Sequence, residues 1–113
     1  DGIIVSNHGG RQLDQTPSSL RALRDIAPIA SPHVEVLVDG GIRHGSDVVI
    51  ALCLGARAAL LGRAWVYGLA AGGESGVTRV LEIIRNDIIR TMQLLGVRSV
   101  DELGPDLLDE QRR

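Results

Sequence analysis

The sequence contains no lysine and no phenylalanine, and only one residue each of cysteine, methionine, tryptophan and tyrosine. A single cysteine, Cys53, cannot form a disulfide within the chain, so nothing here requires an oxidising compartment. The arginines form no block and the formal net charge is −2, which argues against a nucleic-acid or acidic-membrane partner. No apolar run approaches the ~20 residues of a membrane span. We therefore expect a cytoplasmic protein, with peripheral membrane association as the alternative.

Three short apolar runs are present, and a polar turn that contains glycine follows each of them. The runs cover residues 2–5, 34–38 and 58–61. They are apolar almost throughout instead of alternating with polar residues, which is typical of strands buried on both faces of a parallel sheet. The sequence therefore predicts three parallel strands.

Helical patterns separate these runs. The first begins at Thr16-Pro17, with the threonine as N-cap and the proline at the first helical position, and Pro28 should end it. Ser46 or Asp47 should cap the second helix, and Gly55 should end it. Strand and helix thus alternate, which indicates parallel βα units and the α/β class.

The remainder of the sequence is also helical in pattern. Apolar residues recur at three- and four-residue steps from Val77 to Leu95, and Gly96 ends this run. A (β/α)8 (TIM) barrel needs eight strands and about 250 residues, so a barrel would use this chain as its C-terminal portion. The chain also begins at Asp1 without a methionine and directly before a strand, so we expect further sequence to precede it.

Each of the three glycine turns carries an arginine, and the turns should converge. The carboxyl ends of parallel strands meet at one edge of a sheet, where ligands bind in α/β folds. The second turn comprises Asp39, Gly40, Gly41, Ile42 and Arg43, and the third comprises Gly62 and Arg63. Their arginines predict an anionic ligand.

Two features of the second turn suit phosphate. Glycines let the backbone approach a ligand closely, and Arg43 can donate two parallel hydrogen bonds to it. The helix that follows should offer unpaired N–H groups and the positive end of its dipole. Gly62 and Arg63 repeat the arrangement one unit later. The alternative for either turn alone is a tight turn with a solvated arginine, but its recurrence in successive units favours phosphate.

The first turn contains His8 and Arg11. A histidine side chain usually titrates at about pH 6.5, which suits a general base, and the planar fork of an arginine suits a carboxylate. The alternative is an ordinary loop histidine; the position of His8 on the expected ligand edge favours the catalytic interpretation. His33 and His44 lack ligand spacing with other metal-binding residues, so we expect no metal site.

At these turns the sequence resembles the FMN-dependent α-hydroxy acid dehydrogenases and oxidases, which include glycolate oxidase, L-lactate dehydrogenase, mandelate dehydrogenase and flavocytochrome b2. Three segments carry the resemblance in the expected order: SNHGGRQLD at 6–14, VDGGIRHGSDV at 38–48 and LLGRAWVYGLAAGGE at 60–74. The first is the most specific. The resemblance extends from residue 1 to about residue 95.

The resemblance implies that residues 1–113 are the C-terminal portion of a TIM-barrel domain, supplying about strands six to eight and the following helices. It implies that His8 is the catalytic base, that Arg11 binds the substrate carboxylate, and that the second and third turns line the FMN phosphate and ribityl chain. The implied reaction oxidises a small L-2-hydroxy acid, such as lactate, glycolate or mandelate, to the 2-oxo acid. Oxygen, a quinone or a cytochrome would reoxidise the flavin, and a homotetramer is implied.

The family also uses an aspartate beside the histidine, a lysine near the flavin and substrate-contacting tyrosines, none of which this chain matches. We therefore expect the 113 residues alone to be inactive. Two alternatives are another FMN- or phosphate-binding TIM-barrel enzyme and a non-catalytic, phosphate-binding half-barrel.

Overall fold

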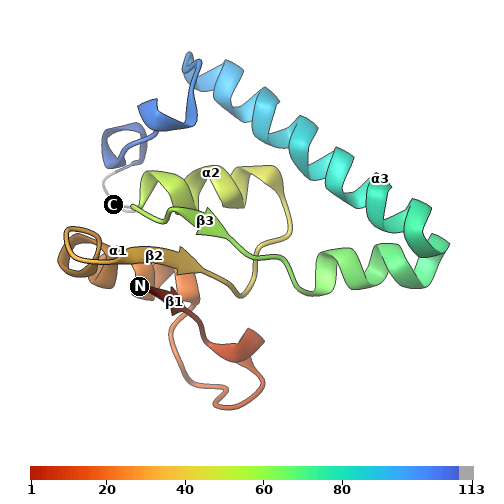
Figure 1. Cartoon of the computed structure of the whole chain (residues 1–113), viewed down its shortest axis with the longest axis horizontal. Helices are drawn as coiled ribbons and strands as arrows, with labels where there is room; N and C mark the ends of the chain where they lie inside the picture. Colours follow the sequence, from red (N-terminus) through yellow and green to blue (C-terminus); the bar gives the residue numbers. More distant parts are fainter. Residues whose placement is uncertain (110–113) are drawn as a thin grey trace.

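The computed structural model describes residues 1–109; residues 110–113 of the expected domain lie outside the described part. Strand and helix alternate as the sequence predicts, and Figure 1 shows the path from β1 at the N-terminus to α3. The main elements are β1 (Gly2–Val5), α1 (Ser19–Ala30), β2 (Glu35–Val38), α2 (Gly45–Cys53), β3 (Ala58–Ala59) and α3 (Arg63–Leu95). Three 3-10 helices complete the chain: η1 (His8–Gly10), η2 (Val100–Glu102) and η3 (Pro105–Leu107).

The three strands form one parallel sheet in the order β1-β2-β3. Val5 pairs with Val38, and Val38 pairs with Ala59, so the carboxyl ends of the strands lie level. Two bonds extend the pairing beyond the strands: Asp39 N donates to Val5 O (3.1 Å) and Leu60 N to Val38 O (2.8 Å). This register brings the three glycine turns to one edge of the sheet.

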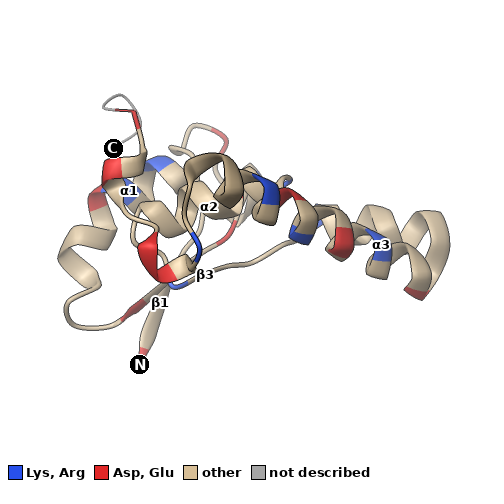
Figure 2. Cartoon of the chain, turned by 90° about the horizontal axis from the view of Figure 1, so that it is seen from above, with Lys and Arg blue, Asp and Glu red and all other residues tan. Residues whose placement is uncertain are grey.

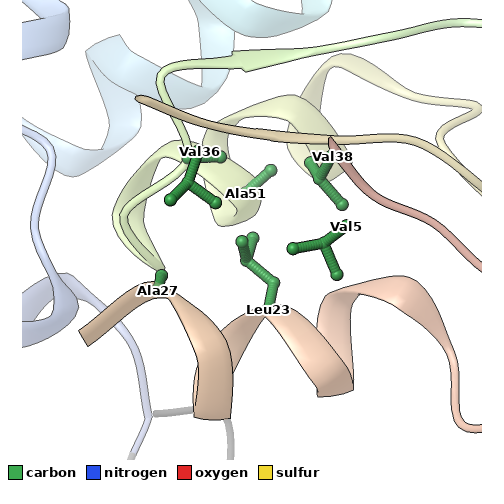
Figure 3. Packing of buried hydrophobic residues seen from close by; sticks show 7 residues of the cluster. Val5, Leu23, Ala27, Val36, Val38 and Ala51 are labelled. Atoms are coloured by element: carbon green, nitrogen blue, oxygen red, sulfur yellow. The ribbon is translucent and has the colours of Figure 1, made fainter. Parts of the chain in front are cut away.

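The hydrophobic core lies between the sheet and the helices α1 and α2, and Figure 3 shows its packing. It consists of Val5, Leu23, Ala27, Val36, Val38, Ala51 and Ala56. Side chains of a strand alternate between its two faces, so Ile4 points away from this core and is 53% exposed. We predicted strands buried on both faces, whereas residues 1–109 cover only one, because both α1 and α2 pack on the same side.

Helix α1 differs from its predicted bounds at both ends. Its N-cap is Ser18, whose Oγ accepts from Arg21 N (3.3 Å), while the Thr16 hydroxyl donates to Leu13 O (3.0 Å). Pro28 lies inside the helix and does not end it. A proline in the last turn removes one backbone hydrogen bond, and the helix continues because Ser31 N still donates to Ala27 O (2.9 Å).

Helix α3 consists of two arms joined by a bend at Gly72 and Gly73 (Figure 1). Gly73 has φ +58° and ψ −139°, a conformation open essentially only to glycine. The first arm (63–71) and the second arm (74–95) approach so closely that a Cβ at Gly76 would collide with the backbone carbonyl of Gly68. The second arm then packs against α2, where a Cβ at Gly45 would collide with Ile88 N.

Charges of both signs alternate along the second arm of α3, as Figure 2 shows. No helix within residues 1–109 is both apolar enough and long enough to cross a membrane. Cys53, at the end of α2, is 1% exposed and therefore buried. Burial raises the pKa of the Cys53 thiol, and the nearby Asp106 carboxylate adds to the shift.

Candidate active site

A cavity of about 730 Å³ opens at the carboxyl ends of the three strands. Every site residue predicted from the sequence lines it: His8, Arg11, Asp39, Gly40, Gly41, Ile42, Arg43, Gly62 and Arg63. The expectation that the three turns converge is therefore correct, and the imidazole of one turn shares a cavity with the arginines of the others.

The turn after β1 has an unusual backbone. His8, Gly9 and Gly10 have φ of 54°, 69° and 72°, and His8 is the one non-glycine residue among residues 1–109 with a positive φ. The left-handed region costs an L-residue roughly 1–2 kcal/mol, so the surroundings must hold His8 there. His8 N donates to Ser6 Oγ (3.0 Å) and Gly9 N to Asn7 Oδ1 (3.1 Å). Because the turn uses its own amides, it offers the cavity mainly the His8 and Arg11 side chains.

The turn after β2 is organised in the opposite way. Gly40 and Gly41 have φ of 90° and 81°, and no hydrogen bond within residues 1–109 uses the N–H groups of Gly40, Gly41 or Ile42. Asp39 Oδ1 is buried and has no hydrogen-bond partner among these residues. A buried carboxylate oxygen without a donor is costly, so the site lacks a donor that a hydroxylated ligand could supply.

The start of α2 offers fewer free N–H groups than we predicted. Asp47 Oδ2 accepts from both Arg43 N and His44 N at 2.9 Å, and Asp87 Oδ2, on α3, accepts from Ser46 N at 3.2 Å. His44 occupies the N-cap position, and the carboxylate of Asp47 does part of the capping expected of it. An anion at this helix start would meet two carboxylates, so the start of α2 suits phosphate less well than we predicted.

The start of α3 is open instead. Gly62 is its N-cap and has no side chain to cap the helix, so the N–H groups of the first turn stay available beside the cavity. Arg63 also reaches across the cavity, where its Nη2 donates to Gly9 O (3.4 Å). The positive end of α3 and the Arg63 side chain therefore lie next to the His8 turn.

Sequence reasoning missed the apolar wall of the cavity. This wall consists of Leu60, Leu61, Tyr67, Val80, Ile83 and Ile84. The wall residues from the second arm of α3, Val80, Ile83 and Ile84, have the same helical spacing as residues of a hydrophobic core. The sequence pattern therefore could not distinguish cavity-lining residues from core residues. No group of three or more histidines, cysteines or acidic residues that could hold a metal ion occurs within residues 1–109.

The fold and the cavity define part of a parallel βα barrel whose ligand site lies at the carboxyl ends of its strands. The chain belongs to the FMN-dependent dehydrogenase family, whose model matches residues 1–110. The predicted family and α/β barrel class are thus confirmed.

Three relatives illustrate the family. Mouse 2-hydroxyacid oxidase 2 is 51% identical over 111 residues, which are 98% of this chain and 31% of that protein. Pre-mycofactocin synthase of Mycobacterium tuberculosis is 54% identical over 103 residues, 91% of this chain and 26% of that one. A flavocytochrome b2 double mutant with pyruvate bound superposes with a TM-score of 0.92 at 46% identity over 98% of this chain and 29% of that one. The chain thus spans less than a third of these relatives.

The residues present fit FMN. Arg43, Arg63 and the open start of α3 suit its phosphate, and the unpartnered Asp39 Oδ1 suits a hydroxyl of its ribityl chain. Gly41 leaves open space where a Cβ would stand, so a ligand can approach its backbone closely. Both the donor set and the acceptor set of the cavity therefore match this cofactor.

Proposed function

We propose that the whole protein is an FMN-dependent enzyme that oxidises a small L-2-hydroxy acid to the 2-oxo acid. Residues 1–113 would be the C-terminal portion of its barrel domain, contributing about strands six to eight. The observation that carries the proposal is that His8 and Arg11 open into the same cavity as Arg43 and Arg63. A base, a carboxylate-binding group and an anion site at one strand edge are what this reaction needs.

In the proposed mechanism Arg11 binds the carboxylate of the substrate and orients its hydroxyl-bearing carbon. His8 accepts a proton from the substrate at an imidazole nitrogen. FMN, when bound, would supply the acceptor for the two electrons and the second hydrogen, so the substrate would leave as the 2-oxo acid. The substrate class is supported by the mouse oxidase and by the pyruvate-bound flavocytochrome b2, since pyruvate is a 2-oxo acid.

The cofactor-binding roles are assigned to the second and third turns. Arg43, Arg63 and the start of α3 would bind the phosphate, while Asp39 would accept from the ribityl chain. Gly40, Gly41, Ile42 and Gly62 would contribute backbone contacts. This assignment gives phosphate binding to the start of α3 and not to the start of α2, where the Asp47 and Asp87 carboxylates accept from Arg43 N, His44 N and Ser46 N.

The proposal extends to the assembly and location of the whole protein. It is a cytoplasmic homotetramer, and an external acceptor such as oxygen, a quinone or a cytochrome reoxidises its flavin. The 113-residue chain on its own is proposed to be inactive.

Anaerobic reduction of the flavin tests the function. The whole protein should bleach its flavin absorbance with at least one of L-lactate, glycolate, (S)-mandelate or a longer L-2-hydroxy acid. The His8→Gln variant should retain FMN yet reduce it at least ~100-fold more slowly, and Arg11→Met should chiefly raise the KM for the acid. If no acid in the panel bleaches the wild-type flavin, the proposal is wrong.

A second candidate is the reaction of pre-mycofactocin synthase, which the identity over this stretch favours to the same degree. The similarity of this chain to its relatives therefore supports FMN as the cofactor and His8 as the base more strongly than it supports a particular substrate. If the whole protein binds FMN but its flavin is reduced by none of the 2-hydroxy acids tested, that result would favour this second candidate.

A further inference from the structure

Among residues 1–109 Ser19 is the one polar residue that is buried, and its hydroxyl does not cap the helix that contains it. It lies in the first turn of α1 and is 1% exposed, while its neighbour Ser18 provides the N-cap. Its Oγ accepts instead from Asn7 N, twelve residues earlier in the chain (3.2 Å). The hydroxyl therefore ties the start of α1 to the residue that precedes His8.

Asn7 in turn holds the His8 turn. Its Oδ1 accepts from Gly9 N (3.1 Å), its backbone O accepts from Gly10 N (3.0 Å), and its Nδ2 donates to Pro17 O (3.5 Å). These bonds fix both residues that follow His8. Because His8 has a positive φ, the turn would relax to a commoner backbone conformation without such restraint.

The same two side chains touch the cofactor turn. A Cβ built on Gly40 would lie 2.7 Å from Asn7 Oδ1 and 2.7 Å from Ser19 Oγ. Asn7 and Ser19 thus occupy the space beside the second turn, and Gly40 has to be glycine for that reason as well as for its φ of 90°. The His8 turn and the Asp39–Arg43 turn are packed against one shared support.

We propose that Ser19 and Asn7 are positioning residues that hold His8 at the catalytic edge and couple its turn to the turn proposed to bind the cofactor. We call this pair the Ser19–Asn7 anchor. Neither side chain lines the cavity, so neither contacts the ligand; both act through the backbone of the His8 turn. The catalytic part of this inference rests on the proposed function, whereas the anchoring part does not.

The decisive experiment compares Ser19→Ala with Ser18→Ala in the whole protein. Both changes remove a hydroxyl from the start of α1, but only Ser19→Ala removes the acceptor of Asn7 N. Amide hydrogen exchange at Gly9 should quicken about five- to tenfold in Ser19→Ala, the equivalent of one lost hydrogen bond. Ser18→Ala should leave that exchange rate unchanged.

Kinetics separate positioning from general stability. The rate of flavin reduction at saturating acid should fall about 10- to 100-fold in Ser19→Ala, with the KM and the flavin content almost unaltered. A loss of the same size in Ser18→Ala would overturn the proposal, since α1 stability alone would then explain it. Unchanged Gly9 exchange in Ser19→Ala would overturn it as well.

Two further pairs guard against a Ser19 variant that fails to fold. Asn7→Asp keeps an oxygen for Gly9 N and should retain slow Gly9 exchange, whereas Asn7→Ala should lose it. Gly40→Ala should also quicken Gly9 exchange, and Gly41→Ala should not, because both have similar positive φ but only Gly40 faces the anchor. If wild-type protein reduces no flavin while these exchange results hold, the proposed function fails and the anchor stands.

Discussion

The helices α2 and α3 follow neighbouring strands and begin after similar glycine-arginine turns, yet their first turns differ in charge. At and just before the start of α2, the N–H groups of Arg43, His44 and Ser46 donate to the carboxylates of Asp47 and Asp87. The start of α3 follows Gly62, which has no side chain to cap it. Two turns that look equivalent in sequence therefore make one anion site, at α3, and one self-neutralised helix start, at α2.

Magnitudes decide which groups of the anion site matter most. A helix start contributes roughly 0.3–1 kcal/mol to binding a negative charge in most settings. A hydrogen bond from a charged donor contributes about 1.5–3 kcal/mol. The arginine side chains should therefore dominate the binding of a phosphate, with the α3 dipole second and the α2 dipole negligible.

The largest expected effect comes from the arginines. Arg63→Ala and Arg43→Ala should each weaken FMN binding by the whole protein about 10- to 100-fold, since each removes a charged donor. Flavin fluorescence titration gives the dissociation constants. Arg57→Ala is the matched control, because Arg57 precedes β3 at the opposite edge of the sheet. Equal losses in all three variants would mean that overall charge, and not this cavity, governs binding.

A smaller effect should follow when the start of α3 is made to resemble that of α2. No atom lies within 4 Å of a Cβ built on Gly62, so the side chain in Gly62→Asp would meet no neighbouring residue at that position. The new carboxylate should cap the helix and weaken FMN binding roughly tenfold. Gly62→Asn, which caps the helix without adding a charge, should weaken FMN binding distinctly less in the same titration. Equal losses would show that shape matters here and charge does not.

Opening the start of α2 should affect stability and leave cofactor binding nearly alone. Asp47→Ala removes the acceptor of two amides, which should lower the free energy of unfolding by about 1 kcal/mol. Asp47→Asn keeps an acceptor and should lose less. Urea denaturation measures the difference. A large change of FMN affinity in Asp47→Ala would contradict the division of roles between the two helices.

The far end of α2 gives the smallest expected signal. Burial and Asp106 raise the pKa of the Cys53 thiol, so at pH 8 the thiol stays protonated in the folded protein. Cys53 should therefore resist a thiol reagent until denaturant is added. Rapid modification of the native protein would show that α2 opens at this end.

The sequence predicted correctly that strands and helices alternate and that the three glycine turns meet at one cavity, because both follow from local patterns. Apolar runs ended by glycine turns define parallel βα units, and parallel strands must bring those turns to one edge. His8, Arg11, Arg43 and Arg63 could therefore be assigned to one cavity without coordinates.

Some of the errors came from contacts between distant residues. The capping of α2 by Asp87 depends on how α3 folds back, which no local pattern reveals. Ser19 looked like its neighbours Thr16 and Ser18, and only its bond to Asn7 distinguishes it. The Asn7 side chain carried one usable signal, since asparagine before a left-handed residue commonly bonds the backbone two residues on.

The bend at Gly72 and Gly73 has a consequence for how this region can vary. It reverses α3 so that one continuous segment supplies both Arg63 and, from the second arm, the wall residues Val80 and Ile84. Neither glycine lines the cavity. If α3 were straight at this point, Arg63 would move away from the apolar residues of the second arm, and the cavity would lose its shape. Two residues without functional groups thus set the geometry of a pocket they never touch.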